Sequence, residues 1–515
     1  MAETLKKNAV ITLTCTDLNG NGDGIGRLEG GLVVFCRGLL PGERGQALII
    51  KVRPSYAIGK LLFRENDSPL RRPENLICAH FKNGCGSCAL CHVNEEGQLE
   101  LAAGRVRDCL VRIGGIDRNG LKVENCISPA GAACYRNKTV YPFFSENGRI
   151  KTGFYARGSH RPVLLEGETG CLHEHPLAAK IRRSAEKIFD EAGLSVYDEE
   201  KNDGLLRHLT VRVSEYESEA MAIVTVNSDR LPDEPRIAAL FREAVPELGS
   251  LWVNENRAAT NVILGPASHL ILGSETLRCR LGPACFDISP ESFFQVNTFG
   301  AELLYETVYR LSALSPDDSI LDLYCGAGTI GIYLLKRFIE ERGQKDPAAA
   351  GDVGRLPALY GIEIVEAAVA NARRNAVLNG LEASYWHGSV PEVLPSLLKS
   401  GSVLRPTTAI IDPPRKGCDQ PLLETLLELA PAKLIYVSCD PATLARDLKI
   451  LTGRRTYEVK CVQPVNMFPD TGHVETVCCL YHQKKDFISV PYELKNADYL
   501  KKDESDEQIE FCGEE

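Results

Sequence analysis

The feature that most constrains the fold is an alternation of apolar, strand-like runs with helical runs between residues 299 and 482. We expect strands at 319–324, 358–364, 408–412, 433–438 and 474–481, and helices at 329–340, 367–379, 420–429 and 443–452. Repeated strand–helix units predict an open, mostly parallel sheet covered by helices. Residues 341–357 interrupt the pattern and read as a loop-like insertion. The carboxyl-terminal part is therefore expected to be an α/β domain.

The amino-terminal part has a different pattern. Four short β-rich runs, separated by turn clusters, lie at 9–14, 32–36, 45–52 and 57–63. This density of strands and turns predicts a small β barrel, although the strand pattern alone leaves a nucleic-acid role open. The stretch GNGDGIGRLEGGLVVFCRGLLPGE combines Gly-x-Gly-x-Gly-Arg, an apolar strand and Leu-Pro-Gly-Glu, and it resembles the TRAM domain, an OB-like barrel that binds RNA. The resemblance implies an RNA-binding barrel at the amino terminus.

The segment between these two parts is mixed. Residues 68–92 are polar and dense in cysteine, residues 101–180 read as irregular and strand-bearing, and helical patterning begins near Pro176. A strand-rich section follows from Leu205 to Leu281, which predicts a central α+β domain. The expected division is a barrel at 1–66, a central domain with the cysteine cluster at 67–290, a catalytic α/β domain at 291–484 and a flexible acidic tail at 485–515.

A glycine-rich turn follows the first expected strand of the α/β domain, in ILDLYCGAGTIGIYL at 320–334. Asp322 precedes the turn, and Gly326 and Gly328 lie within it. Glycines let the backbone approach a ligand closely, and an acidic residue ending the next strand, here Glu363, commonly binds ribose hydroxyls. A lone Gly-x-Gly is weak evidence. The fuller pattern D-L-x-C-G-x-G-x-x-G resembles motif I of S-adenosylmethionine methyltransferases, which implies a Rossmann-like domain that binds this cofactor.

Three further reactive side chains lie at or near expected strand ends, where open α/β sheets place their ligands. Asp412 follows one strand, Cys439 follows another, and Glu475 begins the last. Each has an ordinary structural interpretation, as a turn former, a packed thiol or a surface carboxylate. Together, a thiol, a carboxylate base and a methyl donor are what C5 alkylation of a pyrimidine requires, because a thiolate added at C6 activates C5 and a base then removes the C5 proton.

The chain at this point resembles the RNA uracil-C5-methyltransferases of the RumA/TrmA type. The matching motifs, in family order, are FFQVN (293–297), DLYCGAG (322–328), DPPRKG (412–417), VSCDPATLARDL (437–448) and HVETV (473–477). The resemblance implies that Cys439 is the nucleophile and that Glu475 removes the proton. It also implies a methyl-donor pocket lined by Gln295, Tyr324, Glu363 and Asp412.

The cysteine content raises a separate question. Nineteen cysteines, an odd number with irregular spacing, do not suggest a disulfide framework. Cys78, Cys85, Cys88 and Cys91 form a dense group whose spacing fits zinc and iron–sulfur ligation about equally well. The family resemblance favours a [4Fe–4S] cluster held by Cys78, Cys85, Cys88 and a distant Cys171, with Cys91 as the rival fourth ligand. The first gap is one residue longer than in the family pattern.

The net charge of −10 argues on its face against a nucleic-acid partner. The charge is segregated, however: residues 101–165 hold 11 Lys and Arg against 4 Asp and Glu, whereas residues 184–250 hold 7 against 15. The basic excess lies near the barrel and the cysteine group, so a patchy RNA-binding surface is expected. No run of about 18 apolar residues and no secretory signal is present, which predicts a cytoplasmic chain without a membrane span, and we expect a monomer.

The expected substrate is structured RNA. The TRAM-like barrel together with the cysteine group favours 23S rRNA, with tRNA as the alternative substrate. A third hypothesis is an RNA-binding assembly factor with a vestigial site, against which the intact set of Gln295, Asp412, Cys439 and Glu475 argues. A radical methylthiotransferase would need a different cysteine spacing and a different position of the TRAM segment.

Overall fold

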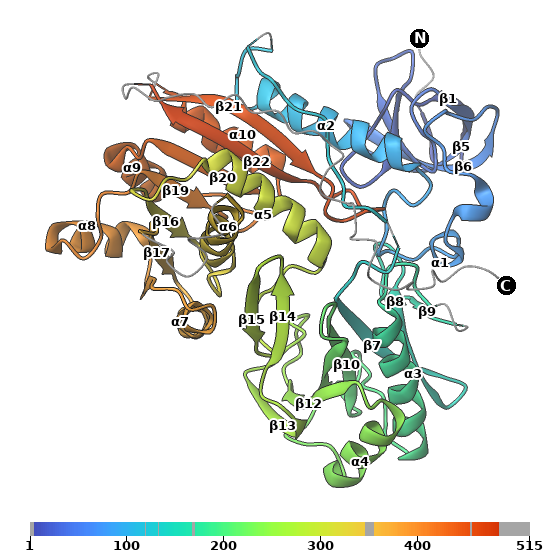
Figure 1. Cartoon of the computed structure of the whole chain (residues 1–515). Helices are drawn as coiled ribbons and strands as arrows, with labels where there is room; N and C mark the ends of the chain where they lie inside the picture. Colours follow the sequence, from blue (N-terminus) through green and yellow to red (C-terminus); the bar gives the residue numbers. More distant parts are fainter. Residues whose placement is uncertain are drawn as a thin grey trace.

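The computed structural model of the chain describes residues 5–118, 120–131, 133–166, 170–345, 355–453 and 456–483. Three sheets of six or seven strands, with their covering helices, follow one another along the sequence, and Figure 1 shows them as a blue, a green and a yellow-to-red part. The predicted fold class is confirmed: a β-rich amino-terminal part, a central α+β part and a mostly parallel α/β part. The predicted acidic tail lies outside the described residues.

The amino-terminal sheet has six strands in the order β1-β5-β6-β4-β3-β2. Their bounds are β1 Val10–Thr14, β2 Asp17–Leu18, β3 Asp23–Arg27, β4 Val33–Arg37, β5 Arg44–Val52 and β6 Tyr56–Arg64. The glycines of the predicted signature have a packing reason. A Cβ on Gly26 would come within 2.6 Å of the Thr14 carbonyl oxygen, and one on Gly24 within 2.6 Å of the Leu39 carbonyl oxygen. The strands can therefore pack this closely only with glycine at both positions.

The central part contains a seven-stranded sheet in the order β13-β12-β11-β10-β7-β8-β9. Its strands are β7 Lys138–Glu146, β8 Arg149–Tyr155, β9 Pro162–Leu164, β10 Leu206–Ser214, β11 Glu219–Val226, β12 Leu248–Glu255 and β13 Ala267–Gly273. Its helices are α3 Pro176–Glu191 and α4 Glu234–Ala244. The short helices η1 Glu74–Leu76 and α1 Ala79–Lys82 precede it in the cysteine-rich segment. Buried side chains of α3 and α4 pack on the strands in one core.

The expectation for residues 101–180 was wrong at the start of that region. Strands β7, β8 and β9 lie within it as expected, but the 18-residue helix α2 spans Glu95–Arg112. Its amino terminus is capped by Asn94, whose side chain accepts a hydrogen bond from the Gly97 amide. The helix is polar along most of its length and buries Val106 and Leu110 against the α/β part. Its stability comes from this packing, which the local sequence does not reveal.

The α/β part contains a seven-stranded sheet in the order β18-β17-β16-β19-β20-β22-β21. Its strands are β16 Ser319–Leu323, β17 Ala358–Glu363, β18 Ser384–His387, β19 Thr408–Ile411, β20 Lys433–Ser438, β21 Tyr457–Val465 and β22 Glu475–His482. Its helices are α5 Thr298–Ser312, α6 Thr329–Lys345, α7 Glu366–Leu378, α8 Val390–Ser400, α9 Gln420–Leu429 and α10 Pro441–Leu451. Strand β22 is antiparallel to β20 and inserts between β20 and β21.

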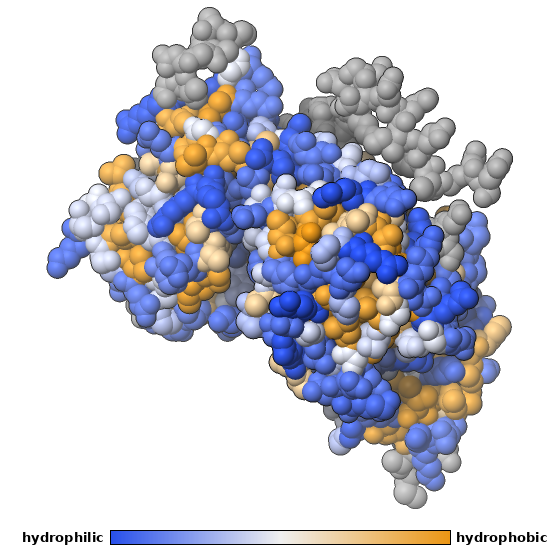
Figure 2. All heavy atoms as spheres, turned by 90° about the horizontal axis from the view of Figure 1, so that it is seen from below, coloured by the Kyte–Doolittle hydropathy of each residue, from blue (hydrophilic) through white to orange (hydrophobic). Residues whose placement is uncertain are grey.

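Helices cover both faces of this sheet. On one face, α5, α6, α7 and the hairpin of β14 Leu277–Leu281 and β15 Ala284–Ile288 form one apolar core with the strands. On the other face, α2, α8, α9 and α10 form a second core. The described residues contain no helix that is long and apolar enough to cross a membrane. Figure 2 shows separate hydrophobic patches among hydrophilic side chains on the face seen from below.

Candidate active site

The candidate site lies where β16, β17, β19 and β20 end and β22 begins. The Asp412 amide donates to the Leu323 carbonyl oxygen at 3.3 Å, and the Tyr324 amide donates to the Ile362 carbonyl oxygen at 3.1 Å. These bonds align the carboxyl ends of the neighbouring strands. Tyr324, Glu363 and Asp412, predicted from the sequence as ligand-binding residues, therefore follow or end adjacent strands.

The turn after β16 has the backbone that a close ligand needs. Tyr324, Gly326 and Gly328 have φ angles of 59°, 55° and 78°, in the left-handed region that favours glycine. A Cβ placed on Gly326 would meet nothing within 4 Å, so there is open space beside this residue. The Glu363 carboxylate borders that space, because its Oε2 accepts from the Gly326 amide at 3.1 Å and its Oε1 from the Val365 amide at 2.9 Å. Glu363 is thus fixed in place and retains accepting capacity on both oxygens.

Asp322 connects the strand before this turn to helix α6 after it. Its Oδ2 accepts from the Gly331 amide of α6 at 3.0 Å, and a Cβ on Gly331 would come within 3.0 Å of the same oxygen. The other oxygen, Oδ1, is buried without a hydrogen-bond partner. Burial raises the pKa of Asp322 to about 7, and the charges of Asp412 and Glu363 add to that rise. Asp322 therefore keeps one buried acceptor that no described residue satisfies.

Gln295 comes well before the glycine-rich turn in the sequence, but hydrogen bonds hold its segment near that turn in space. Asn137 donates to the Gln295 carbonyl oxygen at 3.0 Å, and Asn297 donates to the Met467 carbonyl oxygen at 2.7 Å, so the FFQVN segment is clamped on both sides. The Tyr305 hydroxyl contacts both segments. It hydrogen-bonds Thr329 at 3.0 Å. Burial raises the pKa of Tyr305, and a hydrogen bond with Gln295 acts to lower it. Tyr305 therefore connects Gln295 to Thr329, the first residue of α6 after the glycine-rich turn.

Cys439 and Glu475 lie next to each other at the end of one strand ladder. In the antiparallel pairing of β20 with β22, Ser438 is opposite Thr476. Cys439, the residue after Ser438, and Glu475, the residue before Thr476, therefore lie side by side. Cys439 opens the turn into α10, where Asp440 caps the helix by accepting from the Ala442 amide at 2.8 Å. The thiol retains partial exposure, whereas Glu475 is buried.

The electrostatics of this pair are those of a desolvated site. Burial, then the charges of Glu475 and Asp412, raise the pKa of the Cys439 thiol to about 11, and Arg415 acts against them. Burial, then Asp412, raise the pKa of Glu475 to about 8, again opposed by Arg415. Burial raises the pKa of Asp412 to about 7. Three perturbed acids converging at strand ends are characteristic of a reactive site.

Two side chains beside this pair were not singled out from the sequence, although both lie in motifs quoted above. Arg415 is exposed in the DPPRKG segment, and its Nη2 lies 3.5 Å from His473 Nε2. Burial and the charge of Arg415 lower the pKa of His473, which favours the neutral imidazole. The pair lines the approach to Cys439. Arg415 carries a charge that acts on Cys439 and Glu475, and a motif match does not reveal such an electrostatic effect.

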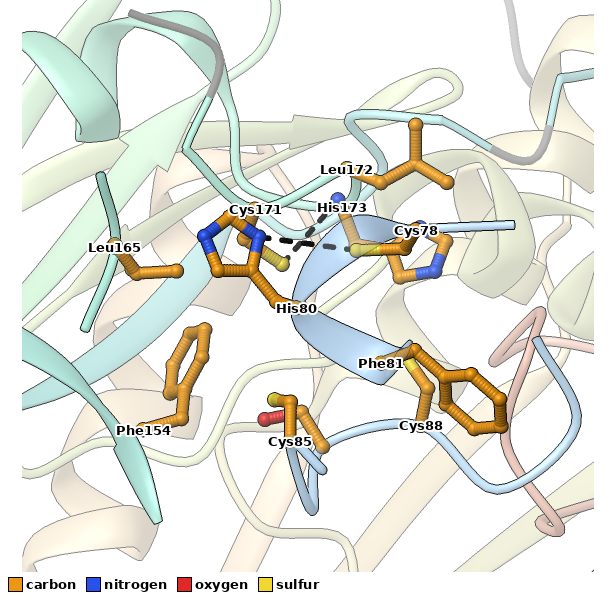
Figure 3. A pocket seen from close by; sticks show the side chains of 11 residues that line it. Cys78, His80, Phe81, Cys85, Cys88, Phe154, Leu165, Cys171, Leu172 and His173 are labelled. Carbon is orange, nitrogen blue, oxygen red and sulfur yellow. Dashed lines mark hydrogen bonds between the residues drawn. The ribbon is translucent and has the colours of Figure 1, made fainter. Parts of the chain in front are cut away.

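The four cysteines predicted as cluster ligands line one small apolar pocket. Cys78, Cys85, Cys88 and Cys171 all contribute to its lining, and their thiols are free. Figure 3 shows these cysteine side chains with helix α1 among them, and Phe154 and Leu165 complete the wall. The rival Cys91 is fully buried outside this lining. Burial raises the pKa of Cys171 to about 11, and for Cys78 hydrogen bonds from His80 and the Phe81 backbone outweigh burial and lower the pKa.

Across the part of the chain that the structure describes, no group of three or more His, Cys, Asp or Glu side chains is arranged to hold a metal ion. The chemistry of the pocket nevertheless suits a sulfur-ligated group, because it offers four free thiols in apolar surroundings. The four predicted ligands therefore lie around one pocket.

A groove lies between the barrel and the segment that precedes Glu475. Its walls are the β2 region at 16–20, helix α2 and the segment 471–474 that precedes Glu475. Arg105, Arg107 and Arg118, from the basic stretch noted in the sequence, line it. The barrel touches the catalytic segment directly, since a Cβ on Gly472 would come within 2.1 Å of the Gly20 carbonyl oxygen. Asp17, Glu100 and Asp108 also line the groove, so its three arginines are matched by three acidic side chains, and His473 is one of the lining residues.

Known proteins resemble this chain over nearly its whole length. The family model of the TRAM domain matches residues 5–62, and the model described as tRNA (uracil-5-)-methyltransferase matches residues 403–484. An uncharacterized RNA methyltransferase of Bacillus cereus is 34% identical over 488 residues, which cover 94% of this chain and 99% of the relative. An uncharacterized RNA methyltransferase of Listeria monocytogenes is 35% identical over 481 residues, which cover 93% of this chain and 99% of the relative.

One solved structure is similar in both fold and sequence. It is the tRNA (uracil-54, C5)-methyltransferase of Pyrococcus abyssi in complex with S-adenosyl-L-homocysteine. The TM-score is 0.69 at 26% identity, and the match covers 91% of this chain and 99% of the other. The likeness therefore extends beyond the α/β part to the other parts of the chain.

Proposed function

Because the chain belongs to the RNA (uracil-5-)-methyltransferase family, we propose that it transfers a methyl group from S-adenosylmethionine to C5 of a uridine in structured RNA. The observation that carries the proposal is the adjacency of Cys439 and Glu475 at the end of the β20–β22 ladder, beside Asp412. A nucleophile and a base held next to each other at the ends of strands are what this reaction needs. We assign the nucleophile to Cys439 and the base to Glu475.

The chemistry follows from the weak nucleophilicity of uracil C5. The Cys439 thiolate forms a bond to C6, and the displaced electron pair makes C5 nucleophilic. S-adenosylmethionine, when bound, supplies an electrophilic methyl group. C5 accepts that methyl group and then carries both it and its original proton. Glu475 takes this proton, the C5–C6 double bond re-forms, and the bond between Cys439 and C6 breaks. The cysteine is released unchanged, so the electrons balance over the cycle.

We propose that Gln295, Tyr324, Glu363 and Asp412 form the methyl-donor pocket. The open space beside Gly326, the fixed carboxylate of Glu363 and the buried, unpartnered Oδ1 of Asp322 support this assignment. Ile364 and Val365, which follow Glu363, are exposed apolar side chains that could cover a flat aromatic ring. This combination suits a nucleoside with ribose hydroxyls and a base, as S-adenosylmethionine has.

The RNA would enter along the groove lined by Arg105, Arg107 and Arg118. These arginines offer partners to phosphates, with Asp17, Glu100 and Asp108 on the same walls, and a target uridine must leave its stack to reach Cys439. We propose 23S rRNA as the substrate, on the combination of the barrel with the cysteine pocket. Transfer RNA is the second candidate, favoured by the likeness to a tRNA (uracil-54, C5)-methyltransferase over 91% of this chain. That extensive likeness means that the barrel alone does not distinguish the two RNAs.

The function is tested with 5-fluorouridine. We expect the protein, given S-adenosylmethionine and 23S rRNA transcripts containing 5-fluorouridine, to form a stable covalent protein–RNA complex, because fluorine cannot leave C5 as a proton does. Matched tRNA transcripts measured in parallel identify the RNA class, and denaturing gels report the complex. Formation only with tRNA would replace the substrate, and no complex with either RNA would refute the mechanism.

We also propose a [4Fe–4S] cluster held by Cys78, Cys85, Cys88 and Cys171, which would organise the junction between barrel and central sheet without redox work. Their common pocket supports this ligand set over one containing Cys91. We expect Cys171→Ser to lose most of the iron of protein purified without oxygen, and Cys91→Ser to retain it. Iron content and visible absorbance are the measurements. Full iron in Cys171→Ser together with loss in Cys91→Ser would reverse the assignment, and a wild-type protein without iron would remove the cluster.

A further inference from the structure

Asp470 occupies an unusual position in the segment that connects β21 to β22. It is fully buried, and its φ of 64° lies in the left-handed region, which is costly for a residue other than glycine. A strained, buried acid persists only where its surroundings hold it strongly. It lies five residues before Glu475, the base of the proposed reaction.

Both carboxylate oxygens of Asp470 are bound by other segments. Arg72 donates to them in a two-pronged contact, at 2.6 Å to Oδ1 and 3.0 Å to Oδ2. Gln98 of α2 donates to Oδ1 at 2.7 Å, and His173 Nε2 lies 3.1 Å from Oδ2. Burial acts to raise the pKa of Asp470, but the contacts with His173 and Arg72 prevail and hold it well below its usual range. The side chain is therefore a charged acceptor shared by three separate parts of the chain.

The backbone of Asp470 is bound in the same way. Its amide donates to Gln98 Oε1 at 2.8 Å, so Gln98 contacts both its side chain and its main chain. Its carbonyl oxygen accepts from the Ala89 amide at 2.9 Å and from the Leu90 amide at 2.8 Å. Every polar group of this one residue is thus engaged, and all the partners lie far away in the sequence.

These partners adjoin the cysteine pocket on two sides. Ala89 and Leu90 immediately follow Cys88. On the other side, the His173 amide donates to the Cys171 sulfur at 3.5 Å. Asp470 therefore contacts the residue that directly follows Cys88 and the residue two positions after Cys171.

The residues after Asp470 lead directly to the reactive pair. The His473 amide donates to Thr471 Oγ1 at 3.2 Å, and Arg105 donates to the Gly472 carbonyl oxygen at 2.6 Å. His473 then meets Arg415, whose charge opposes the rise that burial causes in the pKa of Cys439 and of Glu475. The short segment 470–475 has little freedom once its first residue is fixed.

We propose that Asp470 is a positioning residue that fixes the segment carrying Glu475 against the cysteine-pocket loops, so that the packing of those loops sets where the base stands. The inference rests on the proposed function for the role of Glu475. In this proposal, Asp470 connects the cysteine pocket to Glu475, the residue that removes the proton.

Asp470→Asn tests this connection. The amide keeps the shape but replaces one acceptor with a donor facing Arg72 or His173, so the segment should shift. Displacement of a reacting group by about 1 Å can cost on the order of 100-fold in rate. We expect removal of the C5 proton to slow by about that factor while methyl transfer continues, so that methylated RNA accumulates covalently on Cys439 with ordinary uridine RNA. The affinity for S-adenosylmethionine should not change.

Glu43→Gln is the matched control. Glu43 is equally buried, binds Arg71 at 2.6 Å and accepts from the Leu40 and Ser68 amides, but none of these partners lies in segment 466–475. It should lower thermal stability without accumulating the covalent species. Equal adduct levels in the two variants, or a wild-type level in Asp470→Asn, would overturn the inference.

A second variant and a second measurement keep the test decisive if Asp470→Asn folds poorly. Gln98→Ala removes two contacts with Asp470 and should accumulate the adduct to a smaller degree. Hydrogen exchange needs no activity: amides of 471–475 should exchange faster in Asp470→Asn and Gln98→Ala than in Glu43→Gln. Unchanged exchange would refute the positioning role. If exchange changes but the wild type methylates no RNA, the proposed function fails and the structural connection stands.

Discussion

Replacement of Cys439 by alanine is expected to abolish uridine methylation. The thiol forms the bond that activates C5. Among the described residues, Cys439 is the cysteine that the β20–β22 register places opposite Glu475. Loss of a nucleophile of this kind costs on the order of 10⁴- to 10⁶-fold in rate. Methyl incorporation from labelled S-adenosylmethionine and covalent trapping by 5-fluorouridine RNA should both fall to background.

The control for this variant is Cys285→Ala, which removes a half-buried thiol on β15. It should leave methylation within about twofold of wild type, since surface-like substitutions away from a site have small effects. Binding of S-adenosylmethionine, measured by calorimetry, should survive in Cys439→Ala, because the donor pocket is built from other residues. Covalent trapping that persisted in Cys439→Ala would identify a different nucleophile.

Much of the fold could be predicted because local patterns and tertiary structure agree there. Helix α9 and strand β20 have the bounds expected from the sequence, Gln420–Leu429 and Lys433–Ser438. Both are apolar segments ended by polar or turn-forming residues. Helix α2 was missed because its polar sequence has no strong apolar face, and packing of Val106 and Leu110 on the α/β sheet stabilises it. Periodicity identifies elements that carry their own signal and not those that depend on a partner.

The strand order lay beyond prediction for a related reason. The alternation of strands and helices indicated a mostly parallel sheet but not that β22 inserts between β20 and β21. That insertion brings Cys439 next to Glu475, although 36 residues separate them in the sequence. Family motifs drew attention to both residues, while their adjacency is a property of the sheet. Asp470 carried no signal at all, because an Asp in the segment MFPDTG reads as an ordinary turn former.

Replacement of Glu475 by glutamine is expected to stop the cycle after methyl transfer. Glutamine is close in shape but cannot accept the C5 proton, so elimination should slow by about 10²- to 10⁴-fold. The first turnover should proceed, and methylated RNA should remain attached to Cys439. The pH dependence of product release provides an independent test of the same role. Burial and Asp412 raise the pKa of Glu475 to about 8, so the wild-type carboxyl group is mainly protonated at pH 6 and mainly ionised at pH 9.

Because only the ionised carboxylate can take the proton, release of methylated RNA by the wild type should speed up as pH rises through about 8. Glu475→Gln should lack this rise and keep a slow, flat profile, measured by quenching single turnovers on denaturing gels. Glu458→Gln, which removes an exposed carboxylate paired with Lys460 on β21, should retain both the rate and the rise. A wild-type rate that fell over the same range, or a Glu475→Gln variant that released product normally, would place the base elsewhere. A raised pKa thus serves the reaction, since a carboxylate that is harder to ionise is also a stronger base toward carbon.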